Sequence, residues 1–236
     1  MSFFQEIYKN VVLTQSPRSF LILAGVSILL YRVPLIDKIF RTFHTLLHES
    51  GHAFASLLTG GKNHRMELKT NLSGLTITES KSKFHQFIVA LAGYPFASAS
   101  GFLGFYLIIN DMTGVFHIAL LSIAGLQLLL NIRNTYGIIW AILVCTLLTL
   151  ELIKLPQLMW STGIIICSVI LFESVLMAAH IFILSFRKPS LSGDAANLHK
   201  ITGIHSGFWG TLFLAQSVLF LLCSTKLILS WAEIIG

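Results

Sequence analysis

The residues best suited to chemistry form the run His48-Glu49-Ser50-Gly51-His52. In a helix, histidines four residues apart lie on one face, one turn from each other. Their imidazoles can then bind a single zinc ion, and the glutamate beside them can accept a proton from zinc-bound water. Zinc lowers the pKa of that water to about 7, which supplies a nucleophile for attack on a carbonyl group. The run therefore predicts His48 and His52 as metal ligands and Glu49 as a general base.

The position of this run in the chain supports the same interpretation. It lies in residues 39–59, an otherwise apolar stretch long enough to cross a membrane. Ionisable side chains at membrane depth are costly unless a metal, a partner or water compensates for the lost hydration. Polar contacts between packed helices are the alternative role for these side chains.

A catalytic zinc site generally has three protein ligands, so a third must come from elsewhere. The candidates are His44, Glu151, Glu173, Asp194, His199 and His205. We expect His44 to pack or hydrogen-bond near the site, because it lies a further turn along the same helix. Glu173, in the middle of a later apolar stretch, could approach the histidines. Asp194 follows Gly193 where a helix or re-entrant turn begins, so it could be a ligand or a helix N-cap, and spacing alone leaves both roles open.

The composition identifies the environment of these residues. Only 11% of the 236 residues are charged, against about 25% in soluble globular proteins, and 55% are hydrophobic. These proportions exclude a soluble domain, and the apolar excess excludes disorder. The net charge of +6 comes from basic residues in short segments between apolar runs, which is typical of membrane topology rather than of nucleic-acid binding. The cysteines, Cys145, Cys167 and Cys223, lie inside apolar runs and form no disulfide framework.

Apolar stretches of membrane-spanning length recur along the whole chain. They cover residues 19–35, 39–59, 84–109, 115–132, 136–153, 159–186 and 208–235. The sequence therefore predicts an all-α polytopic membrane protein with about six to seven transmembrane helices. We expect residues 1–236 to form a single membrane-embedded domain. The positive-inside rule places residues 60–83 and 187–207 on the cytoplasmic side, and with them the predicted site.

A small β-hairpin is predicted at residues 62–80, between the second and third spans. Gly60-Gly61 can end the preceding helix, because glycine accepts the left-handed cap conformation. Alternating polar and apolar residues then flank a turn at Asn71–Gly74. The edge of such a hairpin can pair with an extended peptide, and a plain amphipathic connector is the alternative.

Several of these segments together resemble the site-2 protease family of intramembrane zinc metalloproteases. They are HESGHAFASLLTGG, the β-prone stretch after it, AGYPFASASG in the next span, and the late segment SGDAANLHKITGIHSGFWG. The resemblance covers most of residues 40–210 and is closest to the compact branch without a PDZ domain. It implies His48 and His52 as zinc ligands, Glu49 as general base, and Asp194, in the segment 190–207, as the third ligand.

The chain departs from the family pattern around two of its polar residues. Better-known members carry the aspartate in a Leu-Asp-Gly context, whereas this chain has Gly193-Asp194-Ala195. They also have an upstream Asn-Pro-type motif, and here the comparable residues are Asn131 and Asn134, neither followed by proline. Either amide could contact the substrate backbone or an oxyanion. A polar helix end facing the cytosol is the alternative.

The sequence as a whole predicts a zinc metalloendopeptidase embedded in the lipid bilayer. It would hydrolyse peptide bonds of membrane-protein substrates, bound in extended form, with zinc-activated water and Glu49 as general base. A non-proteolytic zinc-binding scaffold or chaperone is one alternative function. A metallopeptidase of another architecture, with Glu173 as third ligand, is a second. We expect no nucleic-acid partner.

Overall fold

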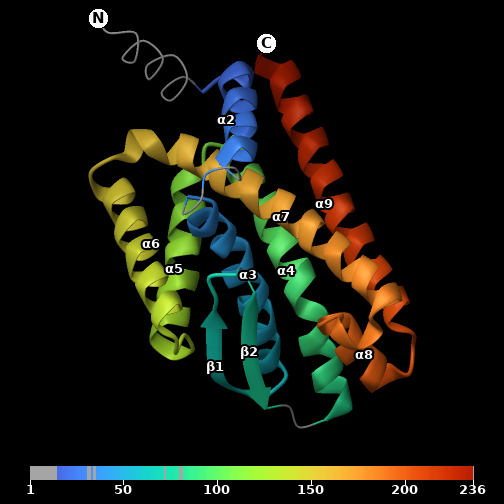
Figure 1. Cartoon of the computed structure of the whole chain (residues 1–236). Helices are drawn as coiled ribbons and strands as arrows, with labels where there is room; N and C mark the ends of the chain where they lie inside the picture. The colour runs from blue at the N-terminus through green and yellow to red at the C-terminus, as the bar shows by residue number, and fades with distance from the viewer. Residues whose placement is uncertain (1–14, 31–32, 34–35, 72, 80–81, 236) are drawn as a thin grey trace, which may run out of the picture.

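Helices account for most of the chain, and their positions follow the apolar stretches closely. The computed structural model describes residues 15–30, 33, 36–71, 73–79 and 82–235 (Figure 1). Its helices are α2 (Pro17–Leu30), α3 (Ile36–Leu58), α4 (Lys83–Ile109), α5 (Thr113–Leu130), α6 (Thr135–Ile153), α7 (Met159–Arg187), α8 (Asp194–Thr202) and α9 (Ser206–Ile235). Short 3-10 turns, Pro156–Leu158 and Pro189–Leu191, precede α7 and α8.

Five of these helices are long and apolar enough to cross a membrane, namely α4, α5, α6, α7 and α9. The other two predicted spans are helical but differ from them. Helix α2 has 14 residues, which is short for a span, and α3 carries Asp37, Lys38, Arg41 and Glu49 within its 23 residues. The end of the first predicted span and residues 1–14 lie outside the described part of the chain. The predicted class, a polytopic helical membrane protein with one small hairpin, is confirmed.

The hairpin consists of β1 (Lys62–Leu68) and β2 (Gly74–Glu79), paired antiparallel with a register irregularity between Asn63 and Arg65. As the sequence predicts, Gly60 adopts a left-handed conformation (φ +75°) at the end of α3. The far edge of β1 is covered by the segment that joins α5 to α6. Met66 N donates to Asn131 O at 2.7 Å, and Arg133 N donates to Met66 O at 3.0 Å. Among the described residues no strand pairs with the far edge of β2.

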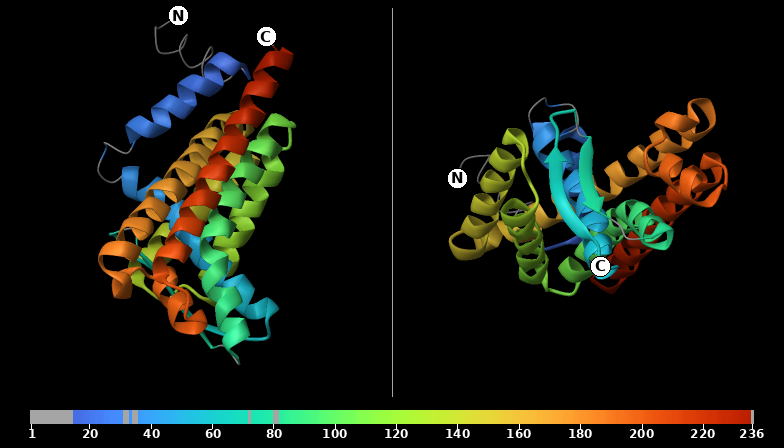
Figure 2. Two further views of the ribbon diagram at one scale, coloured as in Figure 1. Left: turned by 90° about the vertical axis from the view of Figure 1, so that its right-hand side faces the viewer. Right: turned by 90° about the horizontal axis from the view of Figure 1, so that it is seen from below.

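Helix α3 lies at the centre of the molecule, between the hairpin and helices α4 and α7 (Figures 1 and 2). Its approach to α4 depends on Gly51, because a Cβ atom there would lie 2.8 Å from both Ala92 O and Phe96 Cβ. An ion pair joins α3 to α7, in which the Arg41 Nε and Nη2 atoms each lie 2.8 Å from a carboxylate oxygen of buried Glu173. Helix α3 is thus fixed on several sides.

The hairpin and α8 lie at the same end of the helical bundle, opposite the C-terminal end of α9 (Figure 1). The last turns of α3 and the first turns of α4 lie at this end, because α3 packs against the hairpin and α4 packs against α8. The hairpin and α8 therefore come together in space, although residues 84–186 lie between them in the chain.

Candidate metal centre

Two histidines and an aspartate converge at the inner side of α3. The Asp194 Oδ2 atom lies 3.2 Å from both His48 Nε2 and His52 Nε2. The two Nε2 atoms lie 3.1 Å from each other. Among the histidine, cysteine and acidic side chains of the described residues, these three form the group that could hold a metal ion.

These separations fit a tetrahedral metal site. Ligand atoms about 2.0–2.1 Å from a zinc ion at tetrahedral angles lie about 3.3 Å from one another. The three distances between the ligand atoms are close to that value, so one ion could contact all three atoms. Two imidazoles and one carboxylate, with a fourth position open, form a donor set typical of catalytic zinc. The residues present therefore fit the metal that the sequence predicts.

Helix α4 sets the orientation of the histidines. His52 Nδ1 lies 2.7 Å from the backbone carbonyl of Val89, to which it donates a hydrogen bond when its Nε2 atom is free to bind a metal. Gly93, one turn further along α4, leaves room for the rings. A Cβ atom there would lie 2.6 Å from His48 Cε1 and 2.7 Å from His52 Nε2. The ring of Tyr94 packs edge-on against His48, with centroids 4.6 Å apart.

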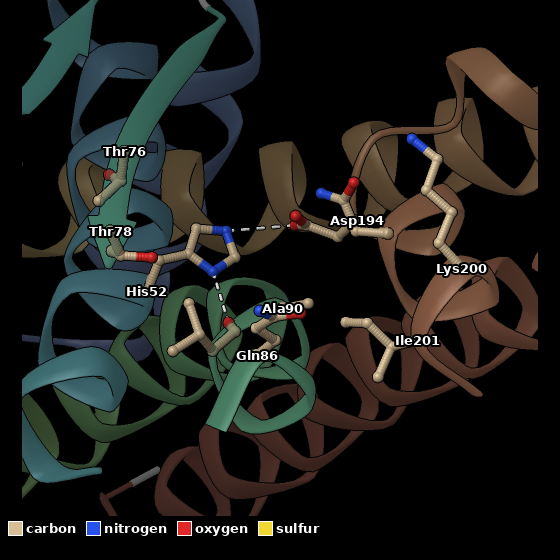
Figure 3. Close-up of a pocket in the computed structure, with 10 residues that line it drawn as sticks. His52, Thr76, Thr78, Gln86, Ala90, Asp194, Lys200 and Ile201 are labelled. Carbon is tan, nitrogen blue, oxygen red and sulfur yellow. Dashed lines mark hydrogen bonds and ion pairs between the residues drawn. The ribbon is translucent and has the colours of Figure 1, made fainter. Parts of the chain in front are cut away.

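Asp194 reaches the histidines because of the backbone at Gly193. Gly193 has φ +54° and ψ −123°, which glycine tolerates far better than other residues, and it serves as the N-cap of α8. Asp194 is therefore the first residue of the helix rather than its cap, and its carboxylate points across to His52 (Figure 3). Burial alone would raise the pKa of Asp194, but the neighbouring His52 and His48 hold that pKa below its usual range.

Glu49 lies beside this cluster under the hairpin. Its carboxylate is buried, and its Oε2 atom accepts a hydrogen bond of 2.6 Å from the Thr76 hydroxyl on β2. Gly74, two residues earlier on the same face of the strand, leaves space for that carboxylate, because a Cβ atom there would overlap it. The hairpin thus covers the glutamate and binds it.

Two cavities border the cluster, one on each side. The first, of about 380 Å³, is lined by His44, His48, Glu49 and apolar side chains such as Met177 and Ile181. The second, of about 350 Å³, is lined largely by polar residues and is drawn in Figure 3. Both cavities include His52, Thr76, Asp194 and Asn197, so the cluster lies where they meet.

The other ligand candidates are not part of the cluster. Glu173 is engaged by Arg41, as described above, and Glu151 lies 3.1 Å from His117 Nε2. His44 is buried and faces the ring of His48, with centroids 6.1 Å apart, in keeping with a packing role. His199 and His205 lie near each other at the far end of α8.

Asn131 and Asn134, considered from sequence as contacts for substrate or an oxyanion, line neither of the two cavities. The Asn134 side chain binds both backbone groups of Leu68 on β1, with its Oδ1 3.1 Å from Leu68 N and its Nδ2 2.6 Å from Leu68 O. The Asn131 amide donates to Gln127 Oε1 at 2.7 Å. Both side chains thus make contacts that hold the hairpin and the end of α5.

Sequence reasoning did not single out Thr76, the Val89 carbonyl or the role of Gly93. A threonine in a β-prone stretch is ordinary, because β-branched residues favour strands. Only the register of the hairpin over α3 brings it to Glu49. Small residues in a membrane span favour close helix packing, but they do not indicate which side chain packs against Gly93.

Comparison with known families agrees with this geometry. A family model described as Peptidase M50B-like matches residues 21–224. Searches of curated proteins and of solved structures each found no match to this chain. The family match covers most of the sequence, including α3, the hairpin and α8. The chain therefore belongs to the Peptidase M50B-like family, that of the site-2 proteases, and is a membrane protein of a metallopeptidase family.

Proposed function

We propose that this member of the Peptidase M50B-like family is an intramembrane zinc endopeptidase that cleaves membrane-protein substrates. The observation that carries the proposal is the meeting of His48, His52 and Asp194 within 3.2 Å, next to a cavity that also contains Glu49. The surrounding helices are apolar enough to span a membrane. Such a group of ionisable side chains is costly there unless it binds a metal.

The three ligands assigned are His48, His52 and Asp194, and the ion that suits them best is zinc. Zn²⁺ favours imidazole nitrogen and carboxylate oxygen in tetrahedral sites, with one position left for water or substrate. When bound, the ion acts as a Lewis acid that activates water for attack on a peptide carbonyl. The hydrogen bond between His52 and the Val89 carbonyl holds the ring in the tautomer that can bind it.

Glu49 is the general base of the proposed reaction. Its buried carboxylate accepts a proton from the attacking water, whose oxygen forms a bond to the carbonyl carbon. As the carbon–nitrogen bond breaks, Glu49 returns that proton to the departing amine. The Thr76 hydroxyl, 2.6 Å from Oε2, restricts the rotation of the carboxylate and leaves the other oxygen for the water.

The substrate is held in extended form along β2. The far edge of β1 is already paired with residues 131–134, whereas β2 borders both cavities through Thr76. An added strand receives its main-chain hydrogen bonds from the β2 edge, which exposes its peptide bonds to the metal centre. A membrane segment that unwinds locally satisfies this requirement, so a single-span protein is the substrate class proposed. The excess of Lys and Arg in 60–83 and 187–207 supports a cytoplasmic location of the site.

The experiment is cleavage of a single-span protein after reconstitution of the full chain in liposomes. We expect about one zinc per chain, cleavage that stops when a chelator removes the metal, and recovery when zinc is restored. Stoichiometric zinc without cleavage of any substrate tested would support the non-proteolytic scaffold instead. Cleavage that persists after complete metal removal would contradict the proposal.

A further inference from the structure

The two cavities beside the metal centre differ in chemical character. The inner cavity, the one that contains His44, has Leu75, Met177 and Ile181 in its wall. The outer cavity, the one drawn in Figure 3, has Thr78, Gln86 and Lys200 instead. A substrate strand that lies along β2 passes from the inner cavity to the outer one, because Thr76 and Asp194 line both cavities.

The two cavities also lie at different depths of the bundle. Along α3, His44 of the inner cavity is two turns further from the hairpin end of the helix than His52. Two polar residues specific to the outer cavity lie near the ends of their elements, Gln86 in the first turn of α4 and Lys200 in the last turn of α8. The outer cavity therefore opens towards the polar end of the bundle, where the hairpin and α8 lie (Figure 1).

The wall of the outer cavity carries a positive charge that no described acidic side chain of the wall neutralises. Among the described residues that line it, Asp194 is the acidic side chain, and it is directed at the two histidines. Lys200 is exposed, lies six residues after Asp194 in α8, and forms no ion pair with an acidic side chain of the described residues. Gln86 and Asn197 add amide groups that can donate hydrogen bonds. The wall thus offers one cation and two amide donors.

We propose that the outer cavity is a substrate subsite for a carboxylate, with Lys200 as its charged determinant. On this assignment, the preferred substrate carries an aspartate or glutamate on the water side of the cleaved bond, within a few residues of it. The inner cavity receives the apolar residues that come from the membrane. The inference rests on the proposed peptidase function and specifies its substrate class.

This preference also separates substrates from other membrane proteins. Cytoplasmic flanks of membrane spans are generally rich in lysine and arginine. A basic residue placed in the outer cavity would meet Lys200, and like charges at a binding site disfavour the wrong partner. The subsite therefore attracts an acidic flank. Such a flank is uncommon among the other membrane spans that could compete for the site.

The test uses three versions of one reconstituted single-span substrate, with Glu, Gln or Lys at the water-side flank. For the wild type we expect kcat/KM to fall in the order Glu, Gln, Lys, by roughly fivefold at each step, as for a partly exposed charge pair. In Lys200→Glu the order reverses, so that the Lys substrate is cleaved best. Lys188→Glu, an exposed residue of the same segment that lines neither cavity, is the matched control and keeps the wild-type order.

The outcomes separate this inference from the function on which it rests. Equal kcat/KM for all three substrates, with normal cleavage, would overturn the carboxylate subsite and leave the peptidase assignment intact. A reversal of order in Lys188→Glu as well would show that general surface charge, and not this cavity, sets the preference. No cleavage of any version by the zinc-loaded wild type would overturn both proposals.

Discussion

The Thr76 hydroxyl on β2 donates a 2.6 Å hydrogen bond to the Oε2 atom of Glu49 on α3. This bond joins the hairpin to the residue proposed as general base. The hairpin is therefore more than a cover over α3. It fixes the side chain on which the proposed proton transfer depends.

Removal of this hydroxyl tests its role. In Thr76→Val, which keeps the shape of the side chain, we expect kcat to fall by about tenfold, because a hydrogen bond to a charged group is worth about 1.5–3 kcal/mol. Zinc content and KM should change little. Thr76→Ser, which restores a hydroxyl, should recover most of the rate. Equal loss in both variants would indicate that Thr76 acts through packing alone.

Gly93 tests the approach of α4 to the metal centre. A methyl group in Gly93→Ala would overlap the rings of His48 and His52, so we expect zinc content to fall severalfold, as measured by metal analysis of the purified protein. Gly125→Ala on α5 is the control, since a Cβ atom there has no neighbour within 4 Å among the described residues. Retention of full zinc content by Gly93→Ala would contradict the proposed position of the ion.

The choice of third ligand can be tested with two acidic residues. Asp194→Ala should lose zinc, because it removes the carboxylate that completes the group formed with His48 and His52. Glu173→Ala should keep its zinc while it unfolds more readily, because the partly buried guanidinium of Arg41 loses its ion pair with buried Glu173. The reverse result, zinc loss in Glu173→Ala alone, would assign the ligand to α7 instead.

Asn134 provides a test of the hairpin anchor. In Asn134→Ala both side-chain hydrogen bonds to Leu68 are lost, so we expect faster amide hydrogen exchange in β1 and slower substrate cleavage. Zinc content should stay normal, because Asn134 lies outside the metal centre. Asn110→Ala, which removes an exposed side-chain contact at the end of α4, serves as the control. Unchanged exchange in β1 would show that the anchor is dispensable.

Local patterns account for the parts of the fold that the sequence predicts well. The hydrophobic stretches, the i, i+4 spacing of His48 and His52, and the glycine at the end of α3 each depend on neighbours in the chain. The predicted second span, 39–59, therefore agrees with the observed α3, Ile36–Leu58, to within a few residues at each end. The polar side chains of α3 set it apart from the five more apolar helices, because they contribute to the site and to the ion pair with Glu173.

Contacts between distant segments could not be derived in the same way. Spacing left Asp194 as either ligand or cap, and only the family resemblance favoured the first role. The structure adds the reason, since the backbone of Gly193 places the carboxylate at the start of α8 and directs it to the histidines. The contact of Thr76 with Glu49 and that of Asn134 with Leu68 depend on how the hairpin lies over α3, which no local pattern records.

The role of Glu49 as general base in peptide hydrolysis is tested most directly by one comparison. It is the cleavage rate of Glu49→Gln against that of the wild type, both reconstituted with equal zinc. Glutamine has nearly the same shape as glutamate but cannot accept the proton. We expect about one zinc per chain in both proteins and a cleavage rate about 10²- to 10⁴-fold lower in the variant. Cleavage at the wild-type rate by zinc-loaded Glu49→Gln would contradict this role of Glu49.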